Sequence, residues 1–423
     1  MNNVDKQYLD ILKDVLENGS YKQTRSGGVY SLFGKSMRFN LKEGLPLLTT
    51  KKVFTKGIIH ELLWFLNGDT NIKYLVENNV HIWDGDSYRH YLELVNKHNE
   101  LCDKRDEISK LGDIEYFYER LDDRHTDLNC GGTIIIQEGI DVSFDDDDEN
   151  DYSIEVEEQT ESLMDFGNRL EKITPISKDE FLIKVQNEDY FTIFIESWDE
   201  MDSLTISDYK YGELGPVYGQ QWRNFGGFGI DQIQNLIDML KTNPDDRRLL
   251  CMAWNPVDMK EMALPPCHYG FQLYTRELTK EERLEWLCNQ SDGEYDEWKT
   301  ASHEKLDDFN VPKRELSLSF SMRSNDFCCG NPYNITQYSL LAYVFCEICN
   351  MVPGELIYNG GDVHVYENHV DAAREQLSRS GSDKIPTFRF ARNIDSIDDL
   401  RYEDFIIENY EPDAPIKYEL NVG

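Results

Sequence analysis

Acidic residues are concentrated in one internal part of the chain, residues 86–211. This segment contains 35 of the 80 aspartates and glutamates but only 12 of the 43 lysines and arginines. Its most acidic stretch, FDDDDENDYSIEVEEQTE (residues 144–161), is typical of a solvated loop, with a protein-contact surface as the alternative interpretation. Helical spacing before this stretch and the strand-like runs EFLIKV and YFTIFIESW after it predict a small α+β insertion. The main domain, with its hydrophobic core, must therefore be formed by the flanking residues, 1–85 and 212–423.

The flanking parts contain a dense series of apolar segments, interrupted by a second charged insertion at 277–313. The sequences on either side of it, HYGFQLYTR and ELSLSFSMRS, resemble strands, which predicts an enlarged hairpin connection. Apolar periodicity predicts a first helix that begins near Val4 and ends at Asn18-Gly19, further helices at 57–68, 230–244 and 334–350, and further strands at 29–41 and 247–255. Because helices and strands alternate irregularly, we expect an α+β fold with a mixed sheet.

The formal net charge of −37 argues against general binding to nucleic acid, which requires clustered lysines and arginines. A small anionic substrate held by a few arginines remains compatible with it. No apolar run reaches membrane-spanning length and the ends show no secretory signal, so we expect a cytoplasmic protein without a membrane partner. The nine cysteines are scattered, which suits a reducing compartment. Cys346 and Cys349 have CxxC spacing but lie in an apolar helical run, so we interpret them as core residues, with a metal or redox role as the alternative.

Cys267 lies in the stretch MALPPCHYGFQ (residues 262–272), after two prolines and before a histidine. A thiol becomes a nucleophile where cationic neighbours lower its pKa, but on its sequence neighbours alone a buried structural cysteine is the more common case. Arginines that suit a phosphate dianion lie in a glycine-containing turn or near expected strand ends: Arg25, Arg247, Arg248 and Arg323. For each of them a surface ion pair is the alternative.

Two further stretches gather polar side chains. RSNDFCCGNPYN (residues 323–334) is expected to turn at Gly330 and Pro332, and Asn334 offers the adjacent donor and acceptor that recognition of a pyrimidine edge requires. Turn and helix-cap chemistry is the alternative interpretation. GGDVHVYENH (residues 360–369) places His364 and Tyr366 on one face of an extended chain, where both could bond a sugar hydroxyl.

Taken together, nine ordered segments of the flanking parts resemble the thymidylate synthase family. They are TRSGGVYSLFGKSMRFNL, PLLTTKK, IIHELLWFLNGDTNIKYLVENNVHIWD, LGPVYGQQWR, DDRRLL, MALPPCHYGFQLY, RSNDFCCGNPYNI, GGDVHVYENH and YEDFIIENYEP. The related phage deoxypyrimidine hydroxymethylases share much of this scaffold. The resemblance covers nearly all of the chain outside the two charged insertions.

The resemblance implies that the enzyme converts dUMP to dTMP with 5,10-methylenetetrahydrofolate, without a metal. Cys267 corresponds to the cysteine that adds to C6 of the uracil ring. The resemblance also implies an obligate homodimer in which Arg247 and Arg248 enter the partner's site. Concentrated positive charge around the shared site would then lower the pKa of the Cys267 thiol.

The resemblance assigns roles to the other candidate residues as well. The expected dUMP contacts are Arg25, Arg247, Arg248, Arg323, Ser324, Asn334, His364 and Tyr366. The expected proton network contains Glu61, Tyr218, His268 and Asn334, and the apolar helix around Glu61 should raise its pKa. The expected folate contacts are Lys51, Ile82, Trp83, Leu264, Asp326 and Gly330. Asn334 favours uracil over cytosine, because the hydroxymethylase that acts on dCMP resembles this scaffold with an aspartate there.

Two alternatives to a thymidylate synthase stay open at this stage. The family has a second tryptophan where this chain has Asp86, and this chain ends in ELNVG rather than in small apolar residues. Both departures bear on the exclusion of water, so a deoxyuridylate hydroxymethylase is one alternative. The other is an interaction protein that binds a partner protein through its acidic insertion.

Overall fold

The computed structural model describes residues 1–93, 212–290 and 301–419, together with seven short strands between residues 134 and 195. Backbone contacts divide the chain into two compact units, Met1–Ser87 with Leu214–Gly423, and Tyr88–Glu213. The larger unit contains every candidate site residue inferred from the sequence.

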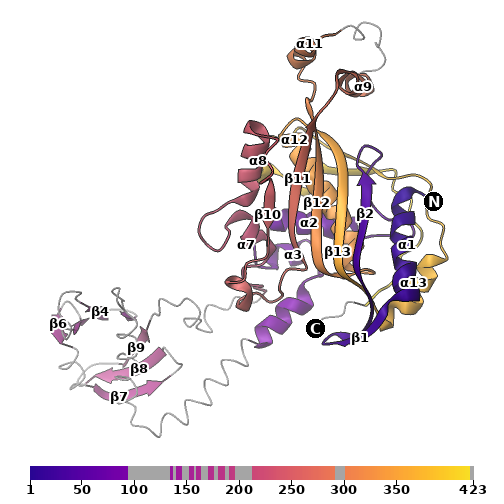
Figure 1. Ribbon diagram of the computed structural model, residues 1–423. Helices are drawn as coiled ribbons and strands as arrows, with labels where there is room; N and C mark the ends of the chain where they lie inside the picture. The colour runs from indigo at the N-terminus through magenta and orange to yellow at the C-terminus, as the bar shows by residue number, and fades with distance from the viewer. Residues whose placement is uncertain are drawn as a thin grey trace. The chain divides into compact units, whose positions relative to one another are not determined.

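A six-stranded sheet forms the centre of the larger unit (Figure 1). Its strands, in spatial order, are β1 (Ser20–Thr24), β2 (Gly27–Asn40), β13 (Val352–Tyr366), β12 (Arg314–Asp326), β11 (His268–Glu277) and β10 (Leu250–Met252). β12 and β13 are parallel, whereas the other neighbours are antiparallel. This mixed sheet, packed with helices, confirms the α+β fold that the sequence predicts.

Helix α1 (Asn3–Asn18) shows how apolar spacing positions a helix on this sheet. The Asn2 side chain caps its start by accepting a hydrogen bond from the backbone N–H of Asp5. Its buried residues include Tyr8, Leu12 and Val15, and this face packs on β2. The helix ends at Asn18, as predicted.

Helices α2 (Thr55–Leu66) and α12 (Gly330–Ile348) are buried over most of their length and pack against each other. α12 also packs on β12 and β13, and Figure 1 shows both helices behind the sheet. The predicted turn at Gly330 and Pro332 is wrong, because both residues lie in the first turn of α12. Proline fits there, since its missing N–H would have no partner within the helix.

The remaining elements of the larger unit complete its core. They are α3 (Lys73–Glu77), α7 (Tyr218–Arg223), α8 (Gln232–Thr242), α13 (Val370–Leu377) and the antiparallel pair β14 (Thr387–Phe390) and β15 (Phe405–Glu408). None of the helices within residues 1–93, 212–290 and 301–419 is long and apolar enough to span a membrane.

The charged stretch at 277–313 joins the antiparallel strands β11 and β12, as predicted. It contains α9 (Lys280–Gln290) and α11 (His303–Asp308), which Figure 1 shows beyond the end of the sheet. Ala301, Leu306 and Val311 form a small apolar core of its own.

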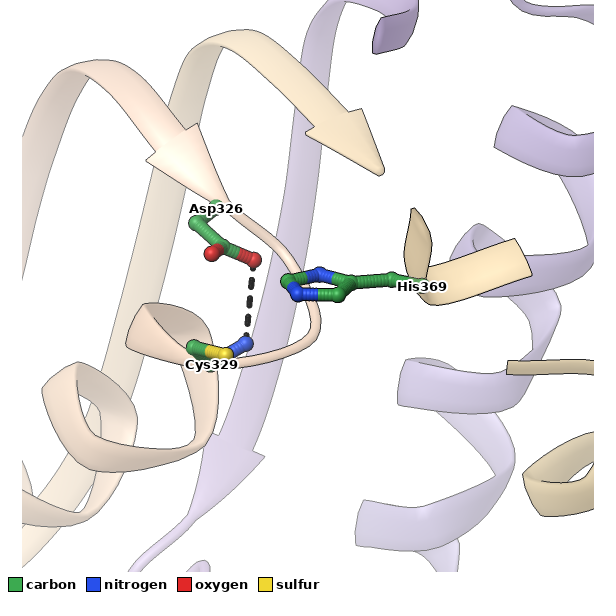
Figure 2. A group of neighbouring side chains, drawn as sticks. All are labelled: Asp326, Cys329 and His369. Atoms are coloured by element: carbon green, nitrogen blue, oxygen red, sulfur yellow. Dashed lines mark hydrogen bonds between the residues drawn. The ribbon is translucent and has the colours of Figure 1, made fainter. Parts of the chain in front are cut away.

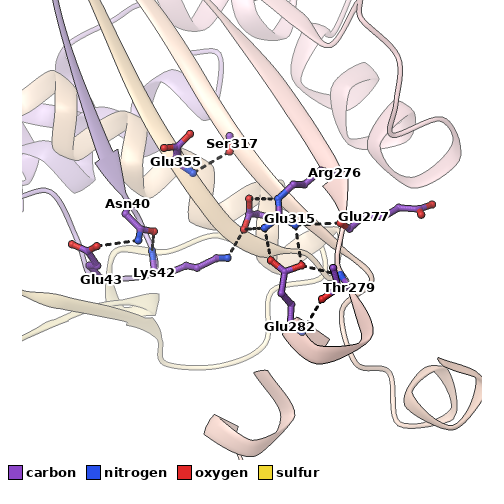
Figure 3. A network of polar contacts seen from close by, with 10 residues as sticks. All are labelled: Asn40, Lys42, Glu43, Arg276, Glu277, Thr279, Glu282, Glu315, Ser317 and Glu355. Carbon is purple, nitrogen blue, oxygen red and sulfur yellow. Dashed lines mark hydrogen bonds and ion pairs between the residues drawn. The ribbon is translucent and has the colours of Figure 1, made fainter. Parts of the chain in front are cut away.

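A network of charges fixes this connection to the end of the sheet (Figure 3). Arg276 donates two hydrogen bonds of 2.9 Å to the Glu315 carboxylate and bonds of 2.6 and 3.0 Å to Glu282. Lys42 also pairs with Glu315. Because Glu282 lies in α9, Arg276 ties the first turns of the connection to β12.

The smaller unit contains a seven-stranded sheet in the order β6-β5-β4-β3-β9-β8-β7, with every pair antiparallel. The strands are β3 (Ile134–Ile136), β4 (Ile140–Phe144), β5 (Tyr152–Val156), β6 (Gln159–Ser162), β7 (Leu170–Pro175), β8 (Glu180–Val185) and β9 (Tyr190–Ile195). The interpretation of all of 144–161 as a loop is therefore wrong: the spacing of Tyr152, Ile154 and Val156 is that of a strand. Most of the helical pattern at 91–111 lies outside the described residues.

Arg283 provides a test of how the connection is stabilised. Its side chain is 3% exposed and donates to the carbonyls of Val311 (2.9 Å) and Pro312 (3.1 Å) and to Asp307 (2.6 Å). We expect Arg283→Met to lower the free energy of opening of the α9 amides by roughly 2 kcal/mol, because buried acceptors lose their donor. Hydrogen exchange measures this effect.

The matched control is Lys313→Met, which removes an exposed partner of the same Asp307 carboxylate. It should cost less than about 1 kcal/mol. Equal losses of protection in the two variants would contradict the role given to Arg283.

Candidate active site

Cys267 lies directly before β11, in a segment fixed from two sides. Its backbone N–H donates to the Tyr218 hydroxyl at 2.8 Å, and its carbonyl accepts from the backbone N–H of Arg323 at 2.8 Å. The Arg323 guanidinium donates to the carbonyls of Pro266 (2.9 Å) and Pro265 (2.7 Å). Proline carbonyls are strong acceptors without a competing N–H, so this segment has few ways to move.

Burial raises the pKa of the Cys267 thiol, and Arg323 opposes this shift only in part. Within the single chain, desolvation disfavours the thiolate, and one arginine does not compensate for it. The lowering that the resemblance implies depends on arginines from a second chain, so it stays a prediction.

Glu61 projects from the buried helix α2. Its Oε1 accepts a hydrogen bond from Trp83 Nε1 at 2.7 Å, and its Oε2 accepts from Gln337 Nε2 at 2.8 Å. Burial raises the pKa of Glu61 to about 7, although both hydrogen bonds oppose the shift. The direction is the one predicted, and it places the proton equilibrium of Glu61 near neutral pH.

Tyr218 and His268 form the next layer of the site. Their rings stack with centroids 4.1 Å apart, and His268 Nδ1 lies 2.7 Å from the Tyr338 hydroxyl. Burial lowers the pKa of His268 to about 3, so its imidazole is neutral. Gln337 and Tyr338 were not predicted as site residues, although both follow Asn334 at the spacing of one helix face.

A cavity of about 420 Å³ brings seven of the predicted residues together. Glu61 and Asn334 line it with five of the predicted folate contacts, Lys51, Ile82, Trp83, Leu264 and Gly330. Asp86, which occupies the position of the family's second tryptophan, lines it too, as do Tyr333, Ile416 and Tyr418.

Asp326, the sixth predicted folate contact, does not line this cavity. Its Oδ1 accepts hydrogen bonds from the backbone N–H groups of Cys328 (2.9 Å) and Cys329 (3.0 Å), which fix the carboxylate at the start of α12. Figure 2 shows His369 facing Asp326 and Cys329. One possible ligand atom of each residue lies within 4.8 Å of those of the other two. These three residues could hold a metal ion, but His369 Nε2 already lies 2.7 Å from the Glu419 carbonyl oxygen.

Lys51 is buried, which the sequence did not lead us to expect for a contact to a charged ligand. Its amine donates to the Cys328 carbonyl at 2.5 Å and lies 4.4 Å from the centre of the Tyr418 ring. Burial lowers its pKa. Its exposed neighbour Lys52 lines the same cavity.

The structure does not bring the predicted phosphate contacts together. Arg25 is exposed in the turn between β1 and β2, at the opposite edge of the sheet from β10. Arg247 and Arg248 are exposed before β10, where the Arg247 carbonyl accepts from Gln272 of β11. Gln272 lies five residues beyond Cys267, or roughly 17 Å along the strand. Of the four predicted arginines, Arg323 is the one whose charge acts on the Cys267 thiol within the described residues.

The predicted sugar contacts lie together on β13. The rings of His364 and Tyr366 meet edge to face with centroids 5.3 Å apart, so the two residues share a face as predicted. His364 pairs with Asp326 across the β12–β13 ladder, and Ser324 pairs with Asp362. The half-buried Ser324 thus lies one strand away from both predicted sugar contacts.

Residues 6–422 match the family model of thymidylate synthase. The chain belongs to the thymidylate synthase family. The thymidylate synthase of Listeria monocytogenes serotype 4a (strain HCC23) is 34% identical over 421 residues, covering 99% of this chain and 100% of the relative. That of Aster yellows witches'-broom phytoplasma (strain AYWB) is 32% identical over 416 residues, covering 98% and 99%.

Membership of the thymidylate synthase family confirms the recognition made from the sequence and makes the chain a folate-dependent methyltransferase. A third relative, the thymidylate synthase of Francisella tularensis subsp. holarctica (strain OSU18), is 31% identical over 431 residues, covering 99% of this chain and 100% of the relative. The matches favour neither the hydroxymethylase nor the interaction protein.

Glu61 provides a test of the electrostatics of this thymidylate synthase site. Its pKa rises from 4.5 to about 7 on folding, so the folded state holds the proton more tightly. The stability associated with that proton is present below pH 4.5 and is lost as the pH rises through about 7. We expect the free energy of unfolding of Glu61→Gln, relative to that of the wild type, to increase by about 2–3 kcal/mol from pH 5 to pH 8. Urea unfolding at the two pH values measures this difference.

Glu43→Gln, which removes an exposed carboxylate, is the control and should show the same difference from wild type at both pH values. If the advantage of Glu61→Gln did not grow with pH, the buried ionisation described here would be contradicted.

Proposed function

We propose that the chain converts dUMP to dTMP, with Cys267 as the nucleophile. The observation that carries this proposal is the pairing, in one cavity, of Asn334 with a Glu61 carboxyl of pKa about 7. Asn334 can donate to O4 and accept from N3–H of uracil, and Glu61 can exchange a proton near neutral pH.

In the proposed mechanism the Cys267 sulfur forms a bond to C6 of uracil, and the electron pair of the C5–C6 double bond moves toward C5 and O4. Asn334 and Glu61 stabilise the charge that develops at O4, while the neutral His268 and Tyr218 complete the surrounding hydrogen bonds. C5 becomes nucleophilic and later loses its proton, and the sulfur leaves when the double bond re-forms.

We propose that 5,10-methylenetetrahydrofolate binds in the 420 Å³ cavity. When bound, it supplies the one-carbon unit and the hydride. Its apolar rings would pack on Ile82, Trp83 and Leu264 beside Gly330. Asp326 does not line the cavity itself, but its carboxylate bonds the backbone of the cavity residues Cys328 and Cys329, and from there it would bond the pterin. Lys51 holds the wall of this cavity through the Cys328 carbonyl.

The nucleotide site is proposed to be completed by a second copy of the chain. Arg25, Arg323 and Ser324 would bind the phosphate together with Arg247 and Arg248 of the partner subunit, and His364 and Tyr366 would bind the 3′-hydroxyl. The distance between Cys267 and the Arg247–Arg248 pair within one chain supports this arrangement, since a pair so placed cannot serve its own site. The added positive charge would favour the Cys267 thiolate over the buried thiol.

We also propose that residues 86–211 and 277–313 are insertions in a catalytic domain made of 1–85 and 212–423, and that 86–211 is the surface for a possible protein partner.

A cytoplasmic location is proposed as well. It is supported by the seven cysteines in the described part of the chain, which are all free thiols.

The reaction is tested by incubating the protein with dUMP and 5,10-methylenetetrahydrofolate. We expect a methylated nucleotide and dihydrofolate by mass spectrometry. Cys267→Ala should reduce turnover by roughly 10⁴-fold or more, because the nucleophile is lost, and should keep measurable dUMP binding. A hydroxymethylated product with tetrahydrofolate, or turnover that survives Cys267→Ala, would overturn the proposal.

The shared site is tested by mixing Arg247→Ala and Cys267→Ala subunits. Half of randomly mixed dimers are hybrids and each hybrid has one intact site, so about a quarter of the wild-type activity should return. Giving the two variants different affinity tags is the control for subunit exchange, because hybrid dimers carry both tags. Hybrids that form but stay inactive would count against a site built from two chains.

A further inference from the structure

The buried amide of Gln337 contacts the Glu61 carboxylate from α12. Gln337 is 1% exposed, and its Nε2 donates to Glu61 Oε2 at 2.8 Å. Trp83 Nε1 donates to the other oxygen, Oε1, at 2.7 Å. Each carboxylate oxygen therefore has its own N–H donor, and the two donors together define the orientation of the carboxylate.

The other end of the Gln337 amide distinguishes it from the other buried glutamines of the described residues. Its Oε1 is buried without a hydrogen-bond partner among those residues. Gln221, in contrast, donates to Asp258 and accepts from Asn255, and Gln376 is also bonded at both ends. The side chains of Gln221 and Gln376 thus connect parts of the fold. The side-chain amide of Gln337 bonds Glu61, and its oxygen has no partner among the described residues.

The position of Gln337 on α12 supports the same conclusion. It follows Asn334 by three residues and precedes Tyr338 by one, so the three side chains share one side of the helix. Asn334 lines the cavity, and the Tyr338 hydroxyl lies 2.7 Å from His268. One side of α12 therefore serves the cavity, the carboxylate and the histidine.

We propose that Gln337 is a positioning residue of the methylation reaction, whose amide holds the Glu61 carboxylate toward the cavity through the oxygen that Trp83 does not contact. This inference rests on the proposed function, because it assigns Glu61 a part in the chemistry.

The Gln337 amide affects the pKa of Glu61, because it favours the carboxylate over the protonated carboxyl group. An N–H donor stabilises the carboxylate, so Gln337 and Trp83 lower the pKa of Glu61 against the opposing effect of burial. The titratable groups that the charge of Glu61 affects are the phenols of Tyr218, Tyr333 and Tyr338. Asp86, Lys51 and Lys52 line the same cavity. Neither lysine is among the causes of the Glu61 shift, and the Lys51 amine donates to the Cys328 carbonyl instead.

The test measures the pH midpoint at which Glu61 ionises in the ligand-free protein. Infrared difference spectroscopy measures it through the band of the protonated carboxyl group. The band that is lost in Glu61→Gln identifies the residue. In Gln337→Met, which keeps the side-chain length but has no N–H donor, the midpoint should rise by about one pH unit or more. An unchanged midpoint would overturn the inference. Gln337→Asn, which keeps the amide but shortens its reach, is the second variant should the first not fold, and the same rise is expected.

Gln221→Met is the matched control, because it also removes a buried amide that donates to a carboxylate, at 2.6 Å from Asp258. It should leave the Glu61 midpoint unchanged; a shift equal to that of Gln337→Met would show a general effect of lost packing and would overturn the inference. In turnover, Gln337→Met should lower kcat by about tenfold while the KM for dUMP stays within about twofold. If the wild type does not methylate dUMP, the proposed function fails, and the infrared midpoint still reports on Gln337 separately.

Discussion

The parallel pairing of β12 and β13, connected through the buried helix α12, determines where most of the candidate site lies. Parallel neighbours cannot be joined by a tight turn, so the chain must leave β12, cross the sheet and return. Arg323, Ser324 and Asp326 lie at the end of β12, Asn334 lies in the first turns of α12, and His364 lies at the end of β13. Because both strands run the same way, these ends meet at one edge, beside the start of β11 and Cys267.

Desolvation is the second constraint, and it shifts each of the reactive groups toward its neutral form. It raises the pKa of Cys267, raises that of Glu61 to about 7 and lowers that of His268 to about 3. In the free single chain all three groups are therefore shifted toward their neutral forms. Compensation comes from specific donors: Trp83 and Gln337 for Glu61, and Arg323 for Cys267, where one arginine does not suffice. A site of this kind needs further positive charge before its thiol can react, which is why the proposed arginine pair of a second subunit matters to the chemistry.

Local patterns in the sequence predicted helices α1, α2, α8 and α12, the β11–β12 pair and the raised pKa of Glu61, since apolar spacing depends on nearby residues. The ordered motifs allowed Cys267, Asn334 and the cavity residues to be identified. Gln337 and Tyr338 could not be found in this way, because each is a polar residue in an apolar helical run whose partner lies on a distant element. The pKa of the Cys267 thiol cannot be read from local patterns either, because it depends on how burial balances against charge in three dimensions. The lowering expected for a site shared by two chains stays a prediction.

The central claim is that Cys267 forms a covalent bond with C6 of the uracil ring. Denaturing mass spectrometry tests it directly when the protein is incubated with 5-fluoro-dUMP and 5,10-methylenetetrahydrofolate. Fluorine at C5 cannot leave as a proton, so the double bond cannot re-form and the sulfur stays attached. If Cys267 bonds to C6, a stable adduct forms on the peptide that contains Cys267. An unmodified protein, or an adduct on another cysteine, would contradict it.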